Sequence, residues 1–509
     1  MKHFALVIVL LVPTLCFADW PQAAGPNHQY VVEDGKALTE FSVARNEGVI
    51  WRTPLPNTGE STPIVSGNRI FLTCHTPMKA DAESGQAIYG MCFDVATGKE
   101  LWRRELPATR ETDMASGFSD NTAASPVADG RHVCFINVGG SVRTYDFDGE
   151  LVWKYDWVPF GRHHARQQEP ILYDGKVIFL KTLATDLKPS MTTKAGAKPL
   201  GRDRKYWTHL HAFELATGKM AWVAESGTSV HSASLFSRTA DGTPAILTGR
   251  GGGHEPPEEP YGMSLINADT GRTIRELPIK GYAAHQNCSW QGNEAAAFVG
   301  MTHHRIDVAT GTLRTETPLN EHVRLRQFFD GKYRTLEDAS PPIPGKKATT
   351  YHTDIRIGDY HYFRTHKGFL IGRVKLSTGT VEYLQVPVQV KHNSSGKQIR
   401  VWDWDGSQQN DVRNNDGFIV YQDKRATLHG WGHVSAASPI VIGDYLYAPT
   451  MLGTVYVLRW NAETLDESAL VSVSDLGPAG KTWSLSSLAY SDGRLYARTM
   501  KELICIGVR

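Results

Sequence analysis

The stretch DVATGKELW at residues 94–102 decides the fold of this chain, because versions of it return throughout the sequence. Each version is an apolar strand, a tight turn closed by glycine and a second strand, and glycine supplies the positive φ that such turns need. The other copies are ELATGKMAW (214–222), NADTGRTI (267–274), DVATGTL (307–313), LSTGTVEY (376–383) and a degenerate YDFDGELVW (145–153). A unit repeated at intervals of tens of residues predicts an array of one supersecondary structure.

A second phrase, made of a short strand, a turn and another strand, precedes the first one in each unit. Its clearest copies are STPIVSGNRIFLTC (61–74), ASPVADGRHVCFIN (124–137), EPILYDGKVIFLKT (169–182) and ASPIVIGDYLYAPT (437–450). Together the two phrases predict four antiparallel strands, A to D, in each of eight units. The A strands are expected to start near Ser61, Ala124, Glu169, Ser232, Asn287, Thr353, Ala436 and Ser486. Four-stranded units repeated around a centre are propeller blades, so we predict an all-β, eight-bladed β-propeller.

The last unit lacks a strand D, because the chain ends with strand C at residues 503–509. The stretch GVIWRTPL at residues 48–55 is available to supply it. Pairing the two ends of the chain would close the ring and leave no open blade edge. We therefore expect the propeller to span residues 48–509, after a signal peptide at 1–18 and an N-terminal extension at 19–47.

The first residues, MKHFALVIVLLVPTLCFA, have a basic start, an apolar stretch and small residues at the end, as a secretory signal has. The apolar stretch is too short to span a membrane, so we expect a periplasmic or secreted protein. A net charge of +1 over 509 residues gives no electrostatic case for nucleic acid. The expected partner is a small molecule or an oligosaccharide, and the expected state is a monomer.

The TGKxxW and SPxVxxG phrases and the opening DWPQAAGPN (19–27) resemble the pyrroloquinoline-quinone-repeat (PQQ-repeat) propellers, most of all secreted members with a WPQxxGPN start. The resemblance covers nearly the whole mature chain and implies the propeller fold. Relatives include quinone-dependent alcohol and sugar dehydrogenases and an outer-membrane assembly scaffold without a cofactor, so the fold does not decide the activity. The alcohol dehydrogenases carry two adjacent cysteines over the quinone, and this chain has no Cys-Cys pair. Their calcium ligands are not matched either, so PQQ is the less favoured cofactor.

The five cysteines that follow the signal lie mostly in apolar strand phrases, so we expect buried thiols. A disulfide between Cys74 and Cys92, on neighbouring strands of the first blade, stays open as an alternative.

Sizeable insertions occur only where strand B connects to C or strand D connects to the next A. They span residues 76–88, 107–119, 183–206, 251–261, 320–349 and 391–430. These connections share one face of a propeller, and long loops gathered on one face of a rigid scaffold usually build a binding site.

Histidine recurs on that face where the A strands start, close to the propeller axis. Neutral imidazole is a common metal ligand, so we predict an axial divalent-metal site for Mn, Zn or Ca. The predicted ligands are His231, His285, His352 and His433, and His164 is a predicted catalytic residue. The alternative is that each histidine caps a blade through hydrogen bonds.

Other polar and aromatic residues belong to the same level of the propeller. Predicted catalytic residues are Arg162, Arg250 and His254, and predicted substrate-binding residues are Arg166, Gln168, Arg356, Trp402 and Trp404. Glu169 and Asp354 also lie at this level. The guanidinium fork suits a uronate carboxylate, and the indoles suit sugar stacking. Interblade ion pairs and a packed loop are the alternatives for these arginines and tryptophans.

Three functions follow as hypotheses. The favoured one is metal-assisted, lyase-type cleavage or binding of uronate-containing carbohydrate at the axis. The second is a PQQ-dependent alcohol or sugar dehydrogenase, and the third is a non-enzymatic scaffold, which needs no polar axial cluster.

Overall fold

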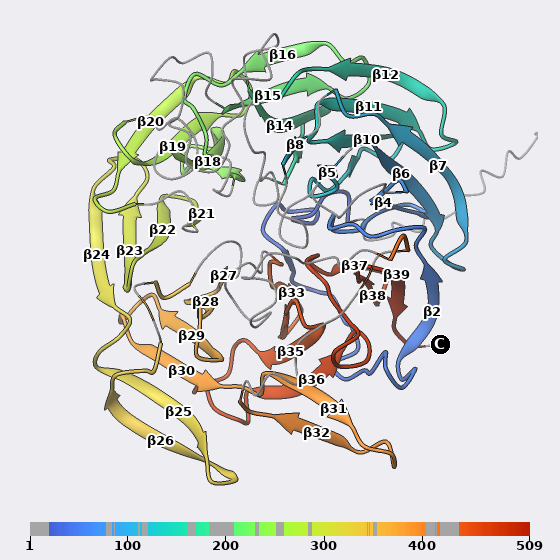
Figure 1. The fold of residues 1–509 in the computed structure, drawn as a ribbon. Helices are drawn as coiled ribbons and strands as arrows, with labels where there is room; N and C mark the ends of the chain where they lie inside the picture. Colours follow the sequence, from blue (N-terminus) through green and yellow to red (C-terminus); the bar gives the residue numbers. More distant parts are fainter. Residues whose placement is uncertain are drawn as a thin grey trace, which may run out of the picture.

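A computed structural model describes residues 20–77, 84–85, 87–109, 112–113, 121–159, 169–182, 208–229, 234–250, 259–282, 288–343, 345, 347–349, 354–403, 413, 415–417 and 437–508. Eight antiparallel sheets stand around one axis, each with strand A at the centre and strand D at the rim (Figure 1). The predicted all-β, eight-bladed propeller is confirmed. No helix of the described residues is long and apolar enough to cross a membrane.

The first four blades each contain four strands in the order A to D. Their strands are β3 (Ile64–Ser66), β4 (Arg69–His75), β6 (Ile88–Asp94) and β7 (Glu100–Leu106); β9 (Val127–Ala128), β10 (His132–Asn137), β11 (Ser141–Asp146) and β12 (Leu151–Asp156); β13 (Ile171–Tyr173), β14 (Lys176–Thr182), β15 (Thr208–Glu214) and β16 (Met220–Val223); β17 (Ser234–Arg238), β18 (Pro244–Arg250), β19 (Gly262–Asn267) and β20 (Thr273–Pro278). Two short insertion segments, β5 (Ser84–Gly85) and β8 (Thr112–Asp113), pair with each other.

The last four blades repeat this order, with additions to blades 6 and 7. Their strands are β21 (Cys288–Gln291), β22 (Glu294–Val299), β23 (Thr302–Asp307) and β24 (Leu313–Pro318); β27 (Asp354–Ile357), β28 (Tyr360–Arg364), β29 (Leu370–Lys375) and β30 (Val381–Gln385); β33 (Ile440–Ile442), β34 (Tyr445–Pro449), β35 (Thr454–Arg459) and β36 (Leu470–Asp475); β37 (Ala489–Ser491), β38 (Arg494–Arg498) and β39 (Glu502–Ile506). Strand D of blade 8 is β2 (Val49–Pro54), which pairs antiparallel with β39 as predicted.

The repeated glycine and tryptophan join neighbouring blades. Gly98 has a φ of +68°, and a Cβ there would lie 2.4 Å from the Trp51 ring of the preceding blade. The Trp51 indole donates a hydrogen bond to the Val95 carbonyl in the same turn. The same pairing recurs at Gly149 with Trp102, Gly218 with Trp153 and Gly271 with Trp222. Glycine is therefore required in this turn for two reasons: the backbone has a positive φ, and a Cβ would clash with the indole ring packed on it.

Two segments outside the repeat extend the blades in opposite directions. β1 (Val31–Val32) pairs parallel with β33, the innermost strand of blade 7, and so lies inside the ring. β25 (Val323–Phe329) pairs parallel with β30 and antiparallel with β26 (Lys332–Ala339), and so extends blade 6 outward. The insertion at 320–349 therefore does not stay on the loop-rich face as expected. Its first half is a hairpin at the rim, beside the hairpin of β31 (Gln389–His392) and β32 (Gln398–Val401) (Figure 1).

The five cysteines of the described residues are all buried, and none of them forms a disulfide. The expectation of buried thiols is confirmed, and the alternative disulfide between Cys74 and Cys92 is not formed.

Candidate functional site

Ten of the thirteen predicted site residues lie outside the described residues, so their placement stays a prediction. These are Arg162, His164, Arg166, Gln168, His231, His254, His285, His352, Trp404 and His433. The structure places the other three, Arg250, Arg356 and Trp402, and it brings a different set of residues to the axis.

Residues 20–36, called the axial segment below, cross the centre of the ring. Trp20 exchanges two backbone hydrogen bonds with Val65 on strand A of blade 1, at 2.8 and 2.9 Å. The Pro21 carbonyl accepts a bond from the Ala128 amide of blade 2. Strand A carries these partners in both blades, so the segment lies on the inner side of the blades.

The same segment continues to the opposite side of the ring. The Gln22 side chain accepts a hydrogen bond from the Leu172 amide of blade 3, and Gln29 donates one to the Phe236 carbonyl of blade 4. β1 then pairs with β33 of blade 7. Because blades 3 and 7 face each other across an eight-bladed ring, the axial segment spans its centre.

The sequence WPQAAGPN accounts for this path residue by residue. Trp20 is fully buried, and its indole donates to the Ala23 carbonyl, which turns the chain back on itself. Gly25 has a φ of +73° and lies under the Trp20 ring, where a Cβ would approach within 3.1 Å. Asn27 closes the next turn by donating to the Val31 carbonyl. The WPQAAGPN motif therefore has a structural role, because its residues fold the chain into a defined shape at the centre of the ring.

Tyr30 brings a phenol to the axis from the axial segment. Its hydroxyl shares a hydrogen bond with Ser438, just before strand A of blade 7. Burial first, and then the carboxylates of Glu169 and Asp354, raise the pKa of Tyr30 above its usual value. Glu169 precedes strand A of blade 3 and Asp354 opens strand A of blade 6. The phenol is therefore protonated at neutral pH and lies among residues from three distant blades.

Carboxylate side chains lie at or just before the first residue of three A strands. Glu60 precedes strand A of blade 1 and is only 2% exposed. Glu169 accepts a hydrogen bond from the Ser125 amide at 3.0 Å, which fixes one of its oxygens. Asp354 is the third carboxylate. Among the described residues, no three His, Cys, Asp or Glu side chains are grouped closely enough to hold a metal ion.

A buried chain of two histidines holds Asp354 in place. His361 on β28 lies 2.8 Å from Asp354 through Nε2, and its Nδ1 lies 2.9 Å from Nε2 of His303 on β23 of the neighbouring blade. Burial lowers the pKa of His361 to about 3, so the ring is neutral. A neutral ring can donate from Nε2 to Asp354 and accept at Nδ1 from His303. This chain fixes the direction of the Asp354 carboxylate.

Two predicted arginines are engaged in ion pairs, one within a blade and one between two blades. Arg250, only 1% exposed at the end of β18, lies 2.8 Å from Glu276 on β20. Arg356 lies 3.0 Å from Glu294 of blade 5, which also pairs with Arg305 at 2.6 Å. Arg356 therefore has the interblade contact that the sequence left open as its alternative role.

Trp402 packs at the rim and not at the axis. Its ring stacks on Phe328 of β25 with the centroids 3.7 Å apart and the planes 7° apart. Tyr333 of β26 contacts it edge-on at 5.6 Å. One face of this indole is thus used to dock the two rim hairpins on each other.

Comparisons with known proteins agree with this architecture. The family model of the outer membrane protein assembly factor BamB matches residues 89–311, a little under half of the chain. The matched residues run from blade 1 into blade 5, and the likeness is consistent with a β-propeller of the PQQ-repeat type. No curated protein sequence matches it.

Several solved structures resemble this chain over most of its length. A europium-containing methanol dehydrogenase has a TM-score of 0.53 at 10% identity, covering 96% of this chain and 98% of that one. Quinohemoprotein alcohol dehydrogenases from Comamonas testosteroni and Pseudomonas putida HK5 have TM-scores of 0.51 and 0.50 at 12% identity, each covering 96% of this chain and 80% of its own. At such identities the likeness shows the fold alone.

Reasoning from the repeats missed Tyr30 and Glu60. Tyr30 precedes the first blade, where no repeat gives a register, and the opening WPQAAGPN was its only signal. Glu60 does lie one residue before the first A-strand phrase, so alignment of the blades on that phrase could have found it.

Proposed function

We propose that a small polar ligand binds near the propeller axis, where the A strands begin, with Tyr30 at the bottom of the site. We further propose that the propeller carries out lyase-type cleavage of uronate-containing carbohydrate there. The observation that carries this proposal is the buried Tyr30 phenol, whose pKa is raised by burial and by the carboxylates of Glu169 and Asp354 on two other blades. Acidic groups that perturb the pKa of a buried phenol are typical of a functional site. The axial segment occupies the centre of the ring, so the ligand would enter from the loop-rich face.

The reaction that suits these groups is elimination next to a uronate. A carboxylate such as Asp354 accepts the proton from the carbon beside the uronate, the bond to the glycosidic oxygen breaks and a double bond forms. The protonated Tyr30 phenol donates its proton to the departing oxygen, which keeps the proton count balanced. His361 and His303 orient Asp354 and do not touch the ligand.

A divalent cation would make the carbon-bound proton more acidic by binding the uronate carboxylate. The described carboxylates are hard oxygen donors that suit Ca²⁺ or Mn²⁺, but they do not form a complete site by themselves. The metal therefore remains a proposal that depends on His231, His285, His352 and His433. Metal analysis of the purified protein, with and without chelator, tests it.

The direct test of function is turnover of uronate oligosaccharides, followed by absorbance of the unsaturated product. We expect Tyr30→Phe to lower kcat by roughly 10² or more, because a proton donor is lost with little change in shape. Tyr333→Phe is the matched control, since that phenol is also hydrogen-bonded, to the Gln385 carbonyl, but lies at the rim. Equal kcat for both variants would remove Tyr30 from the mechanism.

A second function, quinone-dependent oxidation of an alcohol or sugar, is favoured by the carboxylates of Glu60, Glu169 and Asp354 and by the likeness of fold to the dehydrogenases. Dye-linked oxidation after addition of PQQ and Ca²⁺, without any lyase product, would replace the first proposal by this one. If neither activity appears and ligand binding survives Tyr30→Phe and Asp354→Asn, a scaffold role remains.

A further inference from the structure

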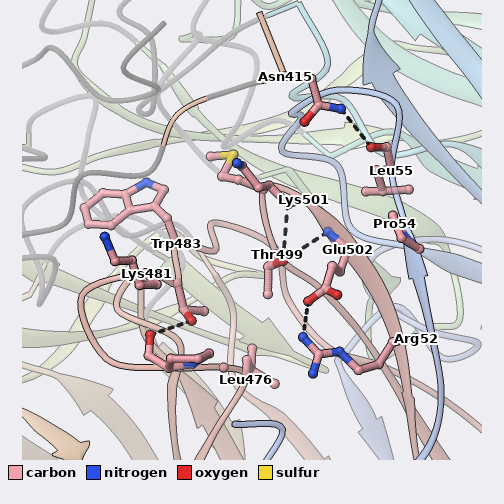
Figure 2. A pocket seen from close by; sticks show the side chains of 14 residues that line it. Arg52, Pro54, Leu55, Asn415, Leu476, Lys481, Trp483, Thr499, Lys501 and Glu502 are labelled. Atoms are coloured by element: carbon pink, nitrogen blue, oxygen red, sulfur yellow. Dashed lines mark hydrogen bonds and ion pairs between the residues drawn. The ribbon is translucent and has the colours of Figure 1, made fainter. Parts of the chain in front are cut away.

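A cavity of about 390 Å³ lies between blade 8 and the crossover from blade 7 (Figure 2). Its lining comes from residues 476–478 and 481–483 of the crossover, residues 499–502 around the turn from β38 to β39, the end of the closing strand β2 with Leu55, and Asn415. The basic side chains of Arg52, Lys481 and Lys501 line it, together with apolar groups of Leu476 and Met500. The volume falls within the usual range for small-ligand sites.

The crossover that carries Lys481 has a fixed shape. Gly477 has a φ of +150°, and a Cβ there would lie 2.5 Å from Oγ1 of Thr482. That hydroxyl donates to the Pro478 carbonyl at 2.9 Å, and the Gly477 amide donates to Asp475 at 3.1 Å. The backbone of the loop that carries Lys481 is therefore held in one shape without a ligand, which lowers the entropy cost of ordering the loop on binding.

A second cavity, of about 450 Å³, lies on the other side of the same loop. It is lined by Ala44, Arg45, Lys391, His392, Pro478 and Ala479. Pro478 lines both cavities, so the two are neighbours along the surface.

Positively charged side chains outnumber negatively charged ones in the lining of the two cavities. Among the described residues that line them, Glu502 supplies the one carboxylate, and it is already paired with Arg52. Arg45 is paired with Glu47 at 2.6 Å. The lysines at 391, 481 and 501 add positive charge to the lining of both cavities. Such a surface attracts anionic ligands, in contrast to the chain as a whole, whose net charge is only +1.

We propose that these two cavities form one groove that binds an acidic oligosaccharide, with carboxylate-bearing sugar units on either side of Pro478. The choice of a sugar rests on the carbohydrate function proposed above. Charge complementarity supports an anion with repeated charges, and the apolar groups of Leu476, Met500 and Pro478 offer contacts for the C–H faces of a sugar ring.

The test is calorimetric binding of a uronate hexasaccharide to the full chain at two salt concentrations. The double variant Lys481→Gln/Lys501→Gln should bind roughly three- to tenfold more weakly and lose part of the salt dependence. Lys219→Gln/Lys332→Gln removes the same charge from exposed positions outside the groove and should bind as the parent does. Lys501→Gln alone repeats the test if the double variant unfolds at a lower temperature.

Two sets of results would contradict the proposal. Unchanged affinity in the double variant, or equal loss in the control, would overturn the groove. Equal affinity for a neutral hexasaccharide, or for poly-glutamate, would overturn the acidic sugar as its occupant.

The two proposals can fail separately. A groove variant that binds normally, while Tyr30→Phe loses turnover, removes the groove and leaves the axial site. Binding that depends on the lysines, without any turnover, removes the axial reaction and leaves the groove.

Discussion

The axial segment and the hairpin of β25 and β26, called the rim hairpin below, both lie outside the repeat, yet they have opposite surroundings. The axial segment contains a fully buried Trp20 and a buried Tyr30. The rim hairpin leaves Phe329 60% exposed and Leu336 45% exposed. The difference shows that the blade edge with which a non-repeat segment pairs determines whether that segment is buried at the axis or exposed at the rim. The inner edge of blade 7 leads to the axis, whereas the outer edge of blade 6 leads to solvent.

The largest effect is expected from truncating the indole of the axial segment. Trp20→Ala should lower the free energy of unfolding by about 3–5 kcal/mol, because a fully buried large side chain leaves a cavity. Trp402→Ala is the rim counterpart and should cost clearly less, since its ring is only half-buried. Urea unfolding followed by fluorescence measures both. Equal losses would mean that the two segments contribute alike.

A smaller effect is expected at Gly25, where backbone and crowding act together. Gly25→Ala should destabilise the protein by about 1–3 kcal/mol, because an L-residue is strained at a φ of +73° and its Cβ would press on the Trp20 ring. Gly67→Ala has the same sign of φ but open space around the added Cβ. The difference between the two variants in thermal unfolding isolates the crowding, and no difference would remove the Trp20 contact from the account.

The next effect concerns pH. Burial lowers the pKa of His28 to about 4, and the Gln22 side chain donates to its Nδ1, which a proton would block. Between pH 6.5 and 4 the unfolded chain binds this proton more readily, so the stability that His28 contributes is present above pH 6.5 and is lost on acidification. At pH 5 this amounts to about 1–2 kcal/mol.

A histidine at the rim, His322, has the opposite pKa shift to His28. The hydrogen bond with Asp338 raises the pKa of His322, so this pair stabilises below pH 6.5 and weakens as the pH rises through the raised value. Unfolding at pH 7 and pH 5 should show a smaller acid loss for His28→Gln and a larger one for His322→Gln. The reverse order would contradict the assignment of these two groups.

The repeat made the blades predictable because every TG turn and every strand phrase carries its own local signal. Gly98 is required by its φ and by Trp51, and the same pair returns in later blades, so alignment within one sequence gave the number of blades and the closing strand. No such register exists for residues 20–36, and the position of Tyr30 depends on long-range pairing of β1 with β33. The rim hairpin was missed for the same reason, since its parallel pairing with β30 leaves no pattern in the sequence. The predicted histidine ring stays a prediction.

Hydrogen–deuterium exchange of the full chain tests the central claim, that the axial segment is a packed element at the centre of the ring. Its amides bond within the segment and to blade 1, and β1 lies against β33. We predict that peptides from residues 20–36 exchange among the slowest in the protein, and that peptides covering β25 and β26 exchange at least tenfold faster. Exchange of residues 20–36 as fast as that of the rim hairpin would contradict the claim.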